Sequence, residues 1–544
     1  MMLKRLFYYI GLVAILLLSF MPAQPVSAHA GLVQAVPDAN SELRESPAAV
    51  ALTFNERLEE GLYYLRVYDS NKRRVTEQPA VLNEAHTVLT LQLPPLEKGT
   101  YLTTYHVISA DGHPVEGSYL FAVGQTLDTP SGTQPDASME HMHRHDGLLD
   151  AFGTKDVLQY AARIAFYMTM LALTGWLMWM RWFGVDRPDD LRLSLKRIAV
   201  GLQQTYTIVY ILFMGAHLGD LIGDGGTDSL VRLFTQTTIG YAWLGGLLLA
   251  LLSFVCLYHR AWLDYAWVAL VWFAKSLLGH AAAFEPRGQT LLLDWLHLGA
   301  ASVWVGGLVM LLYFASAKKE AFRVFLPMFS SAALWSVLLL AVSGAMSVFI
   351  FLPDISYVLE TSWGLWLLAK TALVLLVVLT AAVIRRLFKR KRERTLGVLV
   401  RIDAGLMACI VVIVGIFTYM TPLPPNEPLR WHVMGEKQHM TAQISPNAPG
   451  VNDFTVKVWL PEKLGEPKQV LMKLHAKEMP DVAPFQVPLE PAEDNSVEES
   501  FGMKRYTYKA RGAYLPYAGT WQLEVRVMDS NDDETVYHNE IRIY

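Results

Sequence analysis

The sequence predicts a multidomain protein: an all-α polytopic membrane bundle of about eight helices, flanked by an N-terminal β-sandwich and a C-terminal all-β domain. The chain has 544 residues, which is several times the usual domain size of about 100–200 residues. Hydrophobic residues make up 53% and charged residues 18%, below the ~25% charge of a soluble chain. Long apolar runs fill the middle, whereas both ends alternate with a period of two, as strands do.

Charge and cysteine content narrow the function classes. The 46 Lys and Arg against 50 Asp and Glu leave a net charge of −4, so there is no basic excess for nucleic acid, and we expect no nucleic-acid partner. Two cysteines cannot form a disulfide-stapled scaffold or a four-cysteine zinc or iron–sulfur site. Histidine and methionine are therefore the main remaining candidates for metal ligands.

The first 28 residues are typical of a secretory signal peptide. Lys4 and Arg5 precede an apolar run over residues 6–20, and Val26 and Ala28 are small residues of the kind that a signal peptidase accepts. The run is short for a membrane span. Cleavage after Ala28 makes His29 the new N-terminus. The alternative is an uncleaved anchor in which His29 is an ordinary residue.

Residues 29–124 are predicted to form the N-terminal β-sandwich. Alternating runs separated by Pro, Gly and Asn indicate its strands, and they cover residues 50–54, 62–67, 88–93, 101–107 and 119–123. Residues 125–155 are polar and unpatterned, which predicts a linker.

Residues 156–421 are predicted to form the membrane domain. Each apolar segment is long enough to cross ~30 Å of hydrocarbon; the expected spans are 157–180, 198–222, 238–258, 262–283, 291–314, 325–352, 364–384 and 403–420. Lys and Arg crowd the loops after the first, fifth and seventh spans, which positive-inside reasoning places in the cytoplasm. We therefore expect a multi-pass protein of the plasma membrane, with the lipid bilayer as a partner. Both soluble domains are expected to be extracellular.

Residues 422–544 are predicted to form the C-terminal extracellular β domain. Its first part, residues 422–440, is expected to be a Pro-bearing connector. Its strands are expected at 454–460, 470–474, 506–509, 521–527 and 536–543.

A mature N-terminal histidine suits copper. Its α-amine and imidazole form a chelate of two nitrogens, which favours tetragonal Cu(II). Further ligands can come from the turn 109–114, where Asp111 and His113 flank Gly112. Either feature alone is weak, because Asp-Gly-His is usually only a turn, but together they predict a Cu(II) site made by His29, Asp111 and His113.

The N-terminal domain resembles the copper-resistance protein family CopC over residues 29–124. The resemblance rests on the segments His29-Ala30-Gly31-Leu32, Val36-Pro37-Asp38-Ala39, Leu52-Thr53-Phe54-Asn55-Glu56, Ser109-Ala110-Asp111-Gly112-His113-Pro114 and Gly117-Ser118-Tyr119-Leu120-Phe121. It implies a Greek-key β-sandwich that binds Cu(II) through the His29 amine and imidazole, Asp111 and His113.

The membrane region resembles CopD, the polytopic partner of CopC, most clearly over about 275–385. The matching segments are Leu278-Gly279-His280-Ala281-Ala282, Asp294-Trp295-Leu296-His297-Leu298-Gly299-Ala300, Trp304-Val305-Gly306-Gly307-Leu308 and Trp363-Gly364 with Ala369-Lys370. Residues 515–521 resemble YtkA-like β domains. The whole arrangement is similar to the YcnJ-type copper transport proteins of Gram-positive bacteria.

Histidines inside the spans are candidates for a transport path. Ionisable groups in a bilayer are costly and often functional, and His217, His280 and His297 lie toward one side of three spans. The structural alternative is that each packs neutrally with a hydrogen bond to a neighbouring helix. In the linker, a cluster predicts copper capture, with a solvated polar segment as the alternative; its members are Met139, His141, Met142, His143 and His145.

The predicted function is copper acquisition and transport across the bacterial plasma membrane, without enzymatic activity. The cargo is Cu(II), with Cu(I) left open as a second oxidation state because thioethers favour it. Copper ions are the expected ligands, and an extracellular copper chaperone is a further candidate partner. The alternatives are copper resistance, sequestration or sensing without import, and more remotely an oxidative copper enzyme. The sequence contains no recognisable nucleotide-binding motif, so it does not predict an ATP-driven pump.

Overall fold

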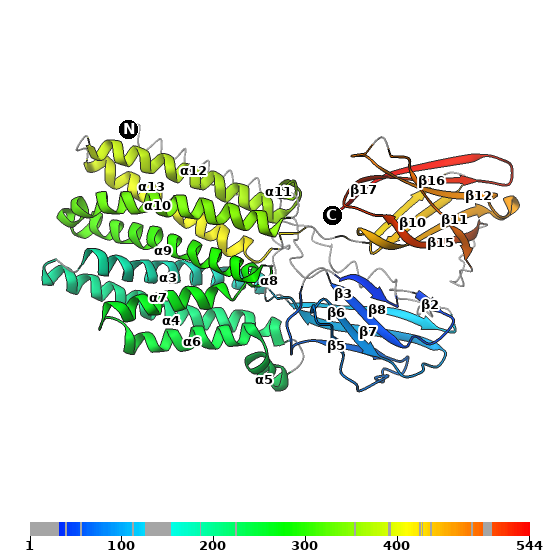
Figure 1. Cartoon of the computed structure of the whole chain (residues 1–544), viewed down its shortest axis with the longest axis horizontal. Helices are drawn as coiled ribbons and strands as arrows, with labels where there is room; N and C mark the ends of the chain where they lie inside the picture. The colour runs from blue at the N-terminus through cyan, green and yellow to red at the C-terminus, as the bar shows by residue number, and fades with distance from the viewer. Residues whose placement is uncertain are drawn as a thin grey trace.

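The computed structural model describes most of the chain outside the N-terminal 31 residues and the linker. The described residues are 32–37, 41–54, 57–110, 112, 114–125, 154–184, 187–222, 226–284, 286–352, 355–389, 393–420, 422–423, 426, 428–435, 438–479, 482–492 and 503–544. They form a helical bundle with a β domain before it and a β domain after it in the chain. Both β domains lie at the same end of the bundle (Figure 1).

The N-terminal domain is a sandwich of two four-stranded sheets. One has the order β1-β3-β6-β5 and the other β2-β8-β7-β4, and only the β2–β8 pair is parallel. Alternate residues of β3 are fully buried, as a half-buried strand requires. The predicted strands are confirmed, and their bounds are β1 Leu32–Val36, β2 Ser41–Leu43, β3 Ala49–Phe54, β4 Tyr64–Tyr68, β5 Val81–Leu82, β6 Val88–Gln92, β7 Gly99–Ile108 and β8 Pro114–Val123.

The membrane region is all helix, as predicted. Seven helices among the described residues are long and apolar enough to cross a membrane. The helices are α3 Thr154–Phe183, α4 Asp189–Ile222, α5 Gly226–Gln236, α6 Thr238–Cys256, α7 Ala261–Ser276, α8 His280–Ala283, α9 Arg287–Ala317, α10 Lys319–Phe351, α11 Tyr357–Glu360, α12 Ser362–Lys389 and α13 Glu393–Phe417.

The expected fourth span, 262–283, is not one helix. It divides into α7 and the four-residue α8, because Gly279 adopts a φ of +94° that a helix cannot contain. The 16 residues of α7 extend about 24 Å, less than the ~30 Å hydrocarbon core. Of the eight expected spans, seven are long helices among the described residues, and the fourth is the shorter helix α7, with His280 beginning a separate short element.

Close contact between α3 and α9 holds the centre of the bundle. A Cβ atom on Gly175 would lie 1.8 Å from the Ser302 carbonyl oxygen, and one on Gly306 would lie 2.3 Å from the Gly175 carbonyl carbon. The Thr174 hydroxyl also donates to the Ser302 hydroxyl across 2.9 Å. Small residues that let backbones touch are the usual basis of helix packing in membranes.

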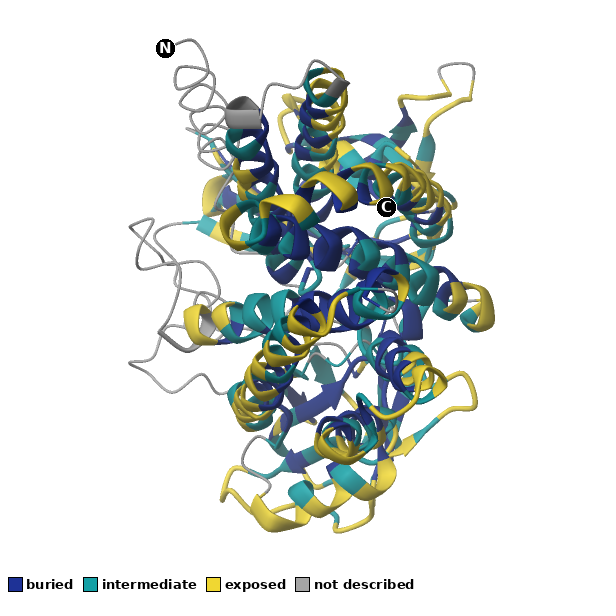
Figure 2. Cartoon of the chain, turned by 90° about the vertical axis from the view of Figure 1, so that its left-hand side faces the viewer, coloured by how far each residue is buried: buried dark blue, intermediate teal, exposed yellow. Residues whose placement is uncertain are grey.

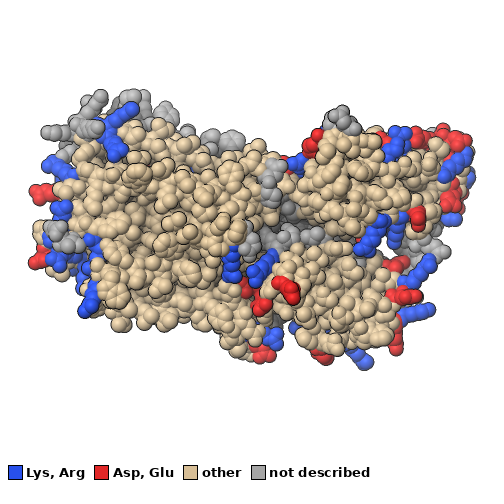
Figure 3. All heavy atoms as spheres, in the orientation of Figure 1, with Lys and Arg blue, Asp and Glu red and all other residues tan. Residues whose placement is uncertain are grey.

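The outer surface of the bundle is apolar, with charge at one end. Large hydrophobic side chains such as Val255, Phe349 and Leu379 are more than half exposed, and exposed residues surround the buried interior in Figure 2. Lys and Arg gather at the end away from the β domains, and the flank between the two ends is almost free of charge (Figure 3). This pattern suits a membrane-embedded bundle.

The C-terminal domain packs a five-stranded sheet, β14-β15-β11-β10-β9, on a four-stranded sheet, β13-β12-β16-β17. The expected strands are confirmed, but the expected connector 422–440 is wrong in part, because the alternation of residues 429–434 forms an edge strand. The elements are β9 Leu429–Met434, β10 His439–Ser445, β11 Gly450–Pro461, η2 Glu462–Leu464, β12 Gln469–Ala476, β13 Phe485–Val487, β14 Glu490–Ala492, β15 Met503–Leu515, β16 Gly519–Met528 and β17 Glu534–Ile543.

Candidate functional site

The predicted Cu(II) ligands and the linker cluster lie outside the described residues. This applies to His29, Asp111 and His113, and to Met139, His141, Met142, His143 and His145. The structure does describe Gly112, which stands between two of the proposed ligands, and the strands on either side of it. Gly112 and the flanking strands are therefore the part of this turn that the structure describes.

Hydrogen bonds anchor the turn before Gly112. The Gly112 N–H donates to the Ser109 carbonyl across 2.9 Å, and the Ala110 N–H donates to the Arg57 carbonyl across 2.8 Å. Gly112 has a φ of +97°, a left-handed conformation that glycine adopts at little cost. The turn is thus held at the end of β7 with its glycine in the conformation that the chain reversal needs.

The turn lies directly on the helical bundle. A Cβ atom on Gly112 would be 3.3 Å from Cδ1 of Ile239, in the first turn of α6. Leu62 and Ile108 of the β-sandwich are buried in the same hydrophobic core as Leu233 and Ile239 of the helical region. The proposed copper turn therefore borders an apolar contact between the two domains.

A buried carboxylate completes this contact. Oε2 of Glu59 accepts a hydrogen bond of 3.1 Å from the Thr238 N–H at the start of α6, where unpaired N–H groups and the helix dipole favour a negative charge. Glu59 is only 8% exposed. Burial raises the pKa of its carboxyl, and the hydrogen bond from Thr238 partly offsets that rise. Next to it, a Cβ on Gly61 would lie 2.8 Å from Cβ of Gln236. We call Glu59, Gly61, Leu62, Ile108 and Gly112, with residues 233–239, the docking contact.

His217 sits at a junction of α3 and α4. Its Nδ1 is 2.9 Å from the Phe213 carbonyl and its Nε2 is 3.0 Å from a guanidinium nitrogen of Arg163. Five residues separate it from the end of α4 at Ile222, about 8 Å along the helix axis. Both ring nitrogens already have neighbours, so a copper ion would have to displace Arg163 to reach Nε2.

His297 lies deeper, on α9. It follows Arg287, the first residue of α9, by ten positions, which places it about 15 Å along the axis. Its Nδ1 is 2.9 Å from the Ser343 hydroxyl of α10, and that hydroxyl donates to the Leu339 carbonyl. Its Nε2 has no hydrogen-bond partner within the described part of the chain. Lys370 of α12 is close enough to interact electrostatically with His297 and with Asp294.

The three histidines do not meet in one coordination shell. His280 begins α8 beside Phe351, with 6.4 Å between ring centroids, whereas His217 and His297 contact α3 and α10 respectively. Across the described ranges, no three His, Cys, Asp or Glu side chains group closely enough to hold a metal ion. If these histidines bind copper, each binds it at a separate position along the bundle, called a station below.

Other polar and charged residues lie among these histidines. Gln159 bonds to Asp220, Arg163 contacts His217, and Lys275 reaches Asp294 at 4.0 Å. Arg163, Lys275 and Asp294 lie inside apolar runs, and an ionisable residue there is itself a signal of function. Asp403 of α13 accepts a 2.8 Å hydrogen bond from Thr380.

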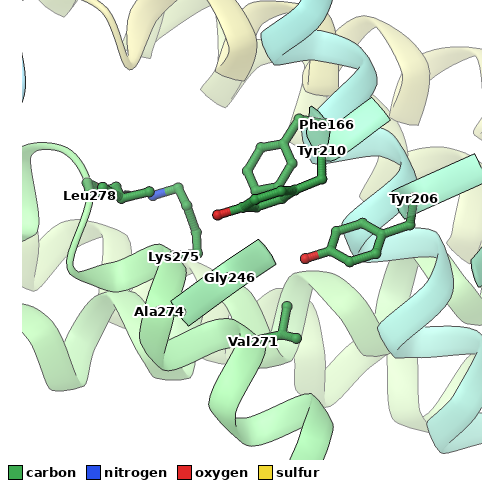
Figure 4. Close-up of a pocket in the computed structure, with 8 residues that line it drawn as sticks. All are labelled: Phe166, Tyr206, Tyr210, Gly246, Val271, Ala274, Lys275 and Leu278. Atoms are coloured by element: carbon green, nitrogen blue, oxygen red, sulfur yellow. Dashed lines mark hydrogen bonds between the residues drawn. The ribbon is translucent and has the colours of Figure 1, made fainter. Parts of the chain in front are cut away.

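A small cavity opens beside Lys275. Figure 4 shows the hydroxyl ends of Tyr206 and Tyr210 turned toward the side of the cavity where Lys275 lies. The Tyr210 hydroxyl donates to the Trp243 carbonyl and the Lys275 ammonium to the Leu278 carbonyl. The cavity lining is aromatic and aliphatic with one ammonium group, a set that repels copper ions.

Comparison with known proteins supplies the family. The chain matches the CopC domain over residues 32–124 and Copper resistance protein D over residues 323–417. It is 25% identical to Copper transport protein CutJ of Bacillus subtilis, over 96% of this chain and 97% of that protein. It is 33% identical to Protein YobA of Escherichia coli K12, over 18% of this chain and 81% of YobA. The crystal structure of CopC from Methylosinus trichosporium OB3b is 35% identical over 18% of this chain and 93% of that one, with a TM-score of 0.17.

Proposed function

Because this chain belongs to the copper transport and resistance family in which CopC and CopD domains are fused, we propose that it acquires copper at the bacterial plasma membrane. The N-terminal domain binds Cu(II) outside the cell and passes it to the helical bundle, which carries it across. The similarity to Copper transport protein CutJ over almost the whole chain supports this reading. Both β domains are extracellular in this proposal, and the chain is a transporter rather than an enzyme.

The proposed Cu(II) ligands are the amine and imidazole of His29 with Asp111 and His113. The two nitrogens of the first residue form a chelate ring, and a carboxylate and a second imidazole complete a tetragonal set that Cu(II) prefers. The linker cluster is a second proposed point of capture. Its thioethers and imidazoles are soft enough for Cu(I) and labile enough to exchange.

The observation that carries the proposal is the docking contact. A Cβ atom added to Gly112, which stands between Asp111 and His113, would lie 3.3 Å from Cδ1 of Ile239. Copper released from the turn is therefore already at the surface of the bundle and does not need to diffuse through solvent. His280, His217 and His297 are then proposed as successive stations, because neutral imidazole binds copper in either oxidation state.

The second candidate function is copper resistance or sequestration without import. The match to Copper resistance protein D over residues 323–417 favours it. The two functions differ in the sign of one measurement, because an importer raises the copper content of the cell whereas a resistance protein lowers it.

Cellular copper content under copper limitation tests the proposal. We expect a deletion strain to hold less copper than its parent, and the intact gene to restore the parental level. A variant with His217, His280 and His297 all replaced by leucine is expected to restore less copper per molecule of membrane-embedded protein. His259→Leu is the matched control, because His259 is exposed in the α6–α7 connection, at the far end of the bundle.

Two outcomes would contradict the proposal. A deletion strain that holds more copper than its parent would assign resistance. Parental uptake per molecule in the triple variant would show that the histidines are packing residues. Protein abundance must be measured in both cases, because a hydrogen bond lost inside a membrane costs about 0.6–2 kcal/mol and can lower the amount of folded protein.

A further inference from the structure

The outer face of β9 and β10 in the C-terminal domain gathers two histidines, a methionine and a tryptophan. In the antiparallel register Met434 lies opposite His439, and His432 lies opposite Thr441. On the next strand, β11, Trp459 lies opposite His439. Side chains two apart on a strand share a face, so His432, Met434, His439 and Trp459 all project from the same side of this sheet.

Ring contacts show that these side chains converge. The imidazoles of His432 and His439 are nearly parallel at 9°, with 6.5 Å between centroids. The indole of Trp459 stands edge-on to His432 at 6.1 Å. Diagonal neighbours on adjacent strands are about 7–8 Å apart at Cα, within reach of long side chains, so modest rotation brings the imidazoles and the Met434 thioether to one point.

The ring nitrogens are arranged as metal ligands usually are. Nδ1 of His432 is 2.7 Å from the Thr441 hydroxyl, a contact that fixes the ring orientation and leaves Nε2 to bind. Nδ1 of His439 is buried and has no hydrogen-bond partner within the described part of the chain. An unsatisfied buried polar atom is costly, and this nitrogen is therefore available to a metal ion.

We infer that His432, His439 and Met434 form a Cu(I) site on the C-terminal domain. Two imidazoles and one thioether are a soft, neutral set that selects Cu(I), whereas hard divalent cations require carboxylates. Met434 is 75% exposed on the edge strand β9, so the thioether side of the site is open to solvent.

The inference rests on the proposed function only for the choice of copper as the metal. It adds a soft site to a protein whose predicted site in the N-terminal domain suits Cu(II). The two sites differ in ligand set and in preferred oxidation state, so they can be tested and can fail independently of each other and of import.

Protection of Met434 from oxidation tests the site in the full-length protein. The probe is Ag(I), a soft monovalent ion that stands in for Cu(I) and does not cycle with peroxide. We expect Ag(I), at a free concentration about tenfold above its dissociation constant, to slow hydrogen-peroxide oxidation of Met434 by about tenfold, because only about one site in ten is then empty. Peptide mass spectrometry measures the rate. Met479, which is 40% exposed on the same domain, is the internal control and keeps its rate.

Replacing both histidines by alanine separates the site from surface effects. In H432A/H439A we expect Met434 to lose its protection, and anaerobic Cu(I) titration against a chromogenic chelator to show one ion fewer per chain. The matched control is H538A on the outer face of the other sheet, which keeps both properties. Unprotected Met434 in the parent protein, or equal protection in H432A/H439A, would overturn the inference. The cellular copper content of these variants tests import and not this site.

Discussion

The docking contact predicts that one hydrogen bond to α6 controls how often the N-terminal domain lifts off the bundle. Glu59→Ala removes the acceptor that the Thr238 N–H uses at 3.1 Å and leaves that N–H at the start of α6 without it. We expect the domain to undock more often in this variant. Glu59→Gln keeps an oxygen acceptor of similar size and serves as the matched control.

The size of the effect follows from two opposing contributions. A hydrogen bond to a charged acceptor contributes about 1.5–3 kcal/mol, and burial of the ionised carboxylate offsets part of it, as the raised pKa of Glu59 indicates. The net value is close to that of an ordinary helix cap, about 1 kcal/mol, which is a factor of about five in the docking equilibrium.

Thiol labelling of Leu62→Cys measures that equilibrium. Leu62 is 5% exposed and packs in the core shared with the bundle, so a cysteine there reacts with a maleimide only when the domain is undocked. The native Cys256 and Cys409 are first replaced by serine. We expect Glu59→Ala to raise the labelling rate about fivefold, with Glu59→Gln at or below the parental rate.

The pH dependence gives a second test of the same contact. Because the docked carboxyl has the raised pKa, the docked form keeps its proton to higher pH than the undocked form does. Docking is therefore most stable at low pH and weakens as the pH rises through the raised pKa. The labelling rate of the parent divided by that of Glu59→Gln should rise with pH over this window. An unchanged rate in Glu59→Ala, or a flat ratio, would refute the role of Glu59.

Two further predictions concern the same domain. The mature protein should begin at His29, as N-terminal sequencing would show, and His29→Ala should weaken Cu(II) binding by more than about tenfold in a chelator competition; equal affinity would exclude the amine chelate. Gly61→Ala should also favour undocking, because its new Cβ would lie 2.8 Å from Cβ of Gln236. Gly226→Ala is its control, because Gly226 also has a positive φ but no atom lies within 4 Å of the added carbon. Equal labelling of Leu62→Cys in the two variants would assign the effect to backbone strain alone.

Local patterns were sufficient to predict the layers of the fold. Alternation located β3, β6 and β16, and apolar runs located the long helices, because burial of one strand face or of a whole helix imposes a short period on the sequence. The same reasoning failed at residues 429–434, where Pro residues upstream concealed an alternation that was present. It also failed at Gly279, because an apolar run does not reveal that one glycine turns the chain out of the helix.

The docking contact could not be predicted, because its partners are remote in sequence. Glu59 and Thr238 are 179 positions apart, and neither Leu62 nor Gly112 carries a periodic signal that distinguishes a domain interface from a domain core. By contrast, the ligands His29, Asp111 and His113 were proposed from residue chemistry and from family resemblance alone, and they stay a prediction. Arg163 and Lys275 were visible as charges in apolar runs, but their partners depend on how the helices pack.

The position of the polar groups in the bundle bears on how copper would cross it. Arg163, His217, Asp294 and His297 all lie in the half of their helices nearest the β domains, and each has a polar neighbour there. A cation of one or two charges meets arginine and lysine as well as histidine in this half, so histidine alone does not make the route attractive. The carboxylates of Asp220 and Asp294 must offset those cations, which makes them as important to a copper path as the imidazoles between them.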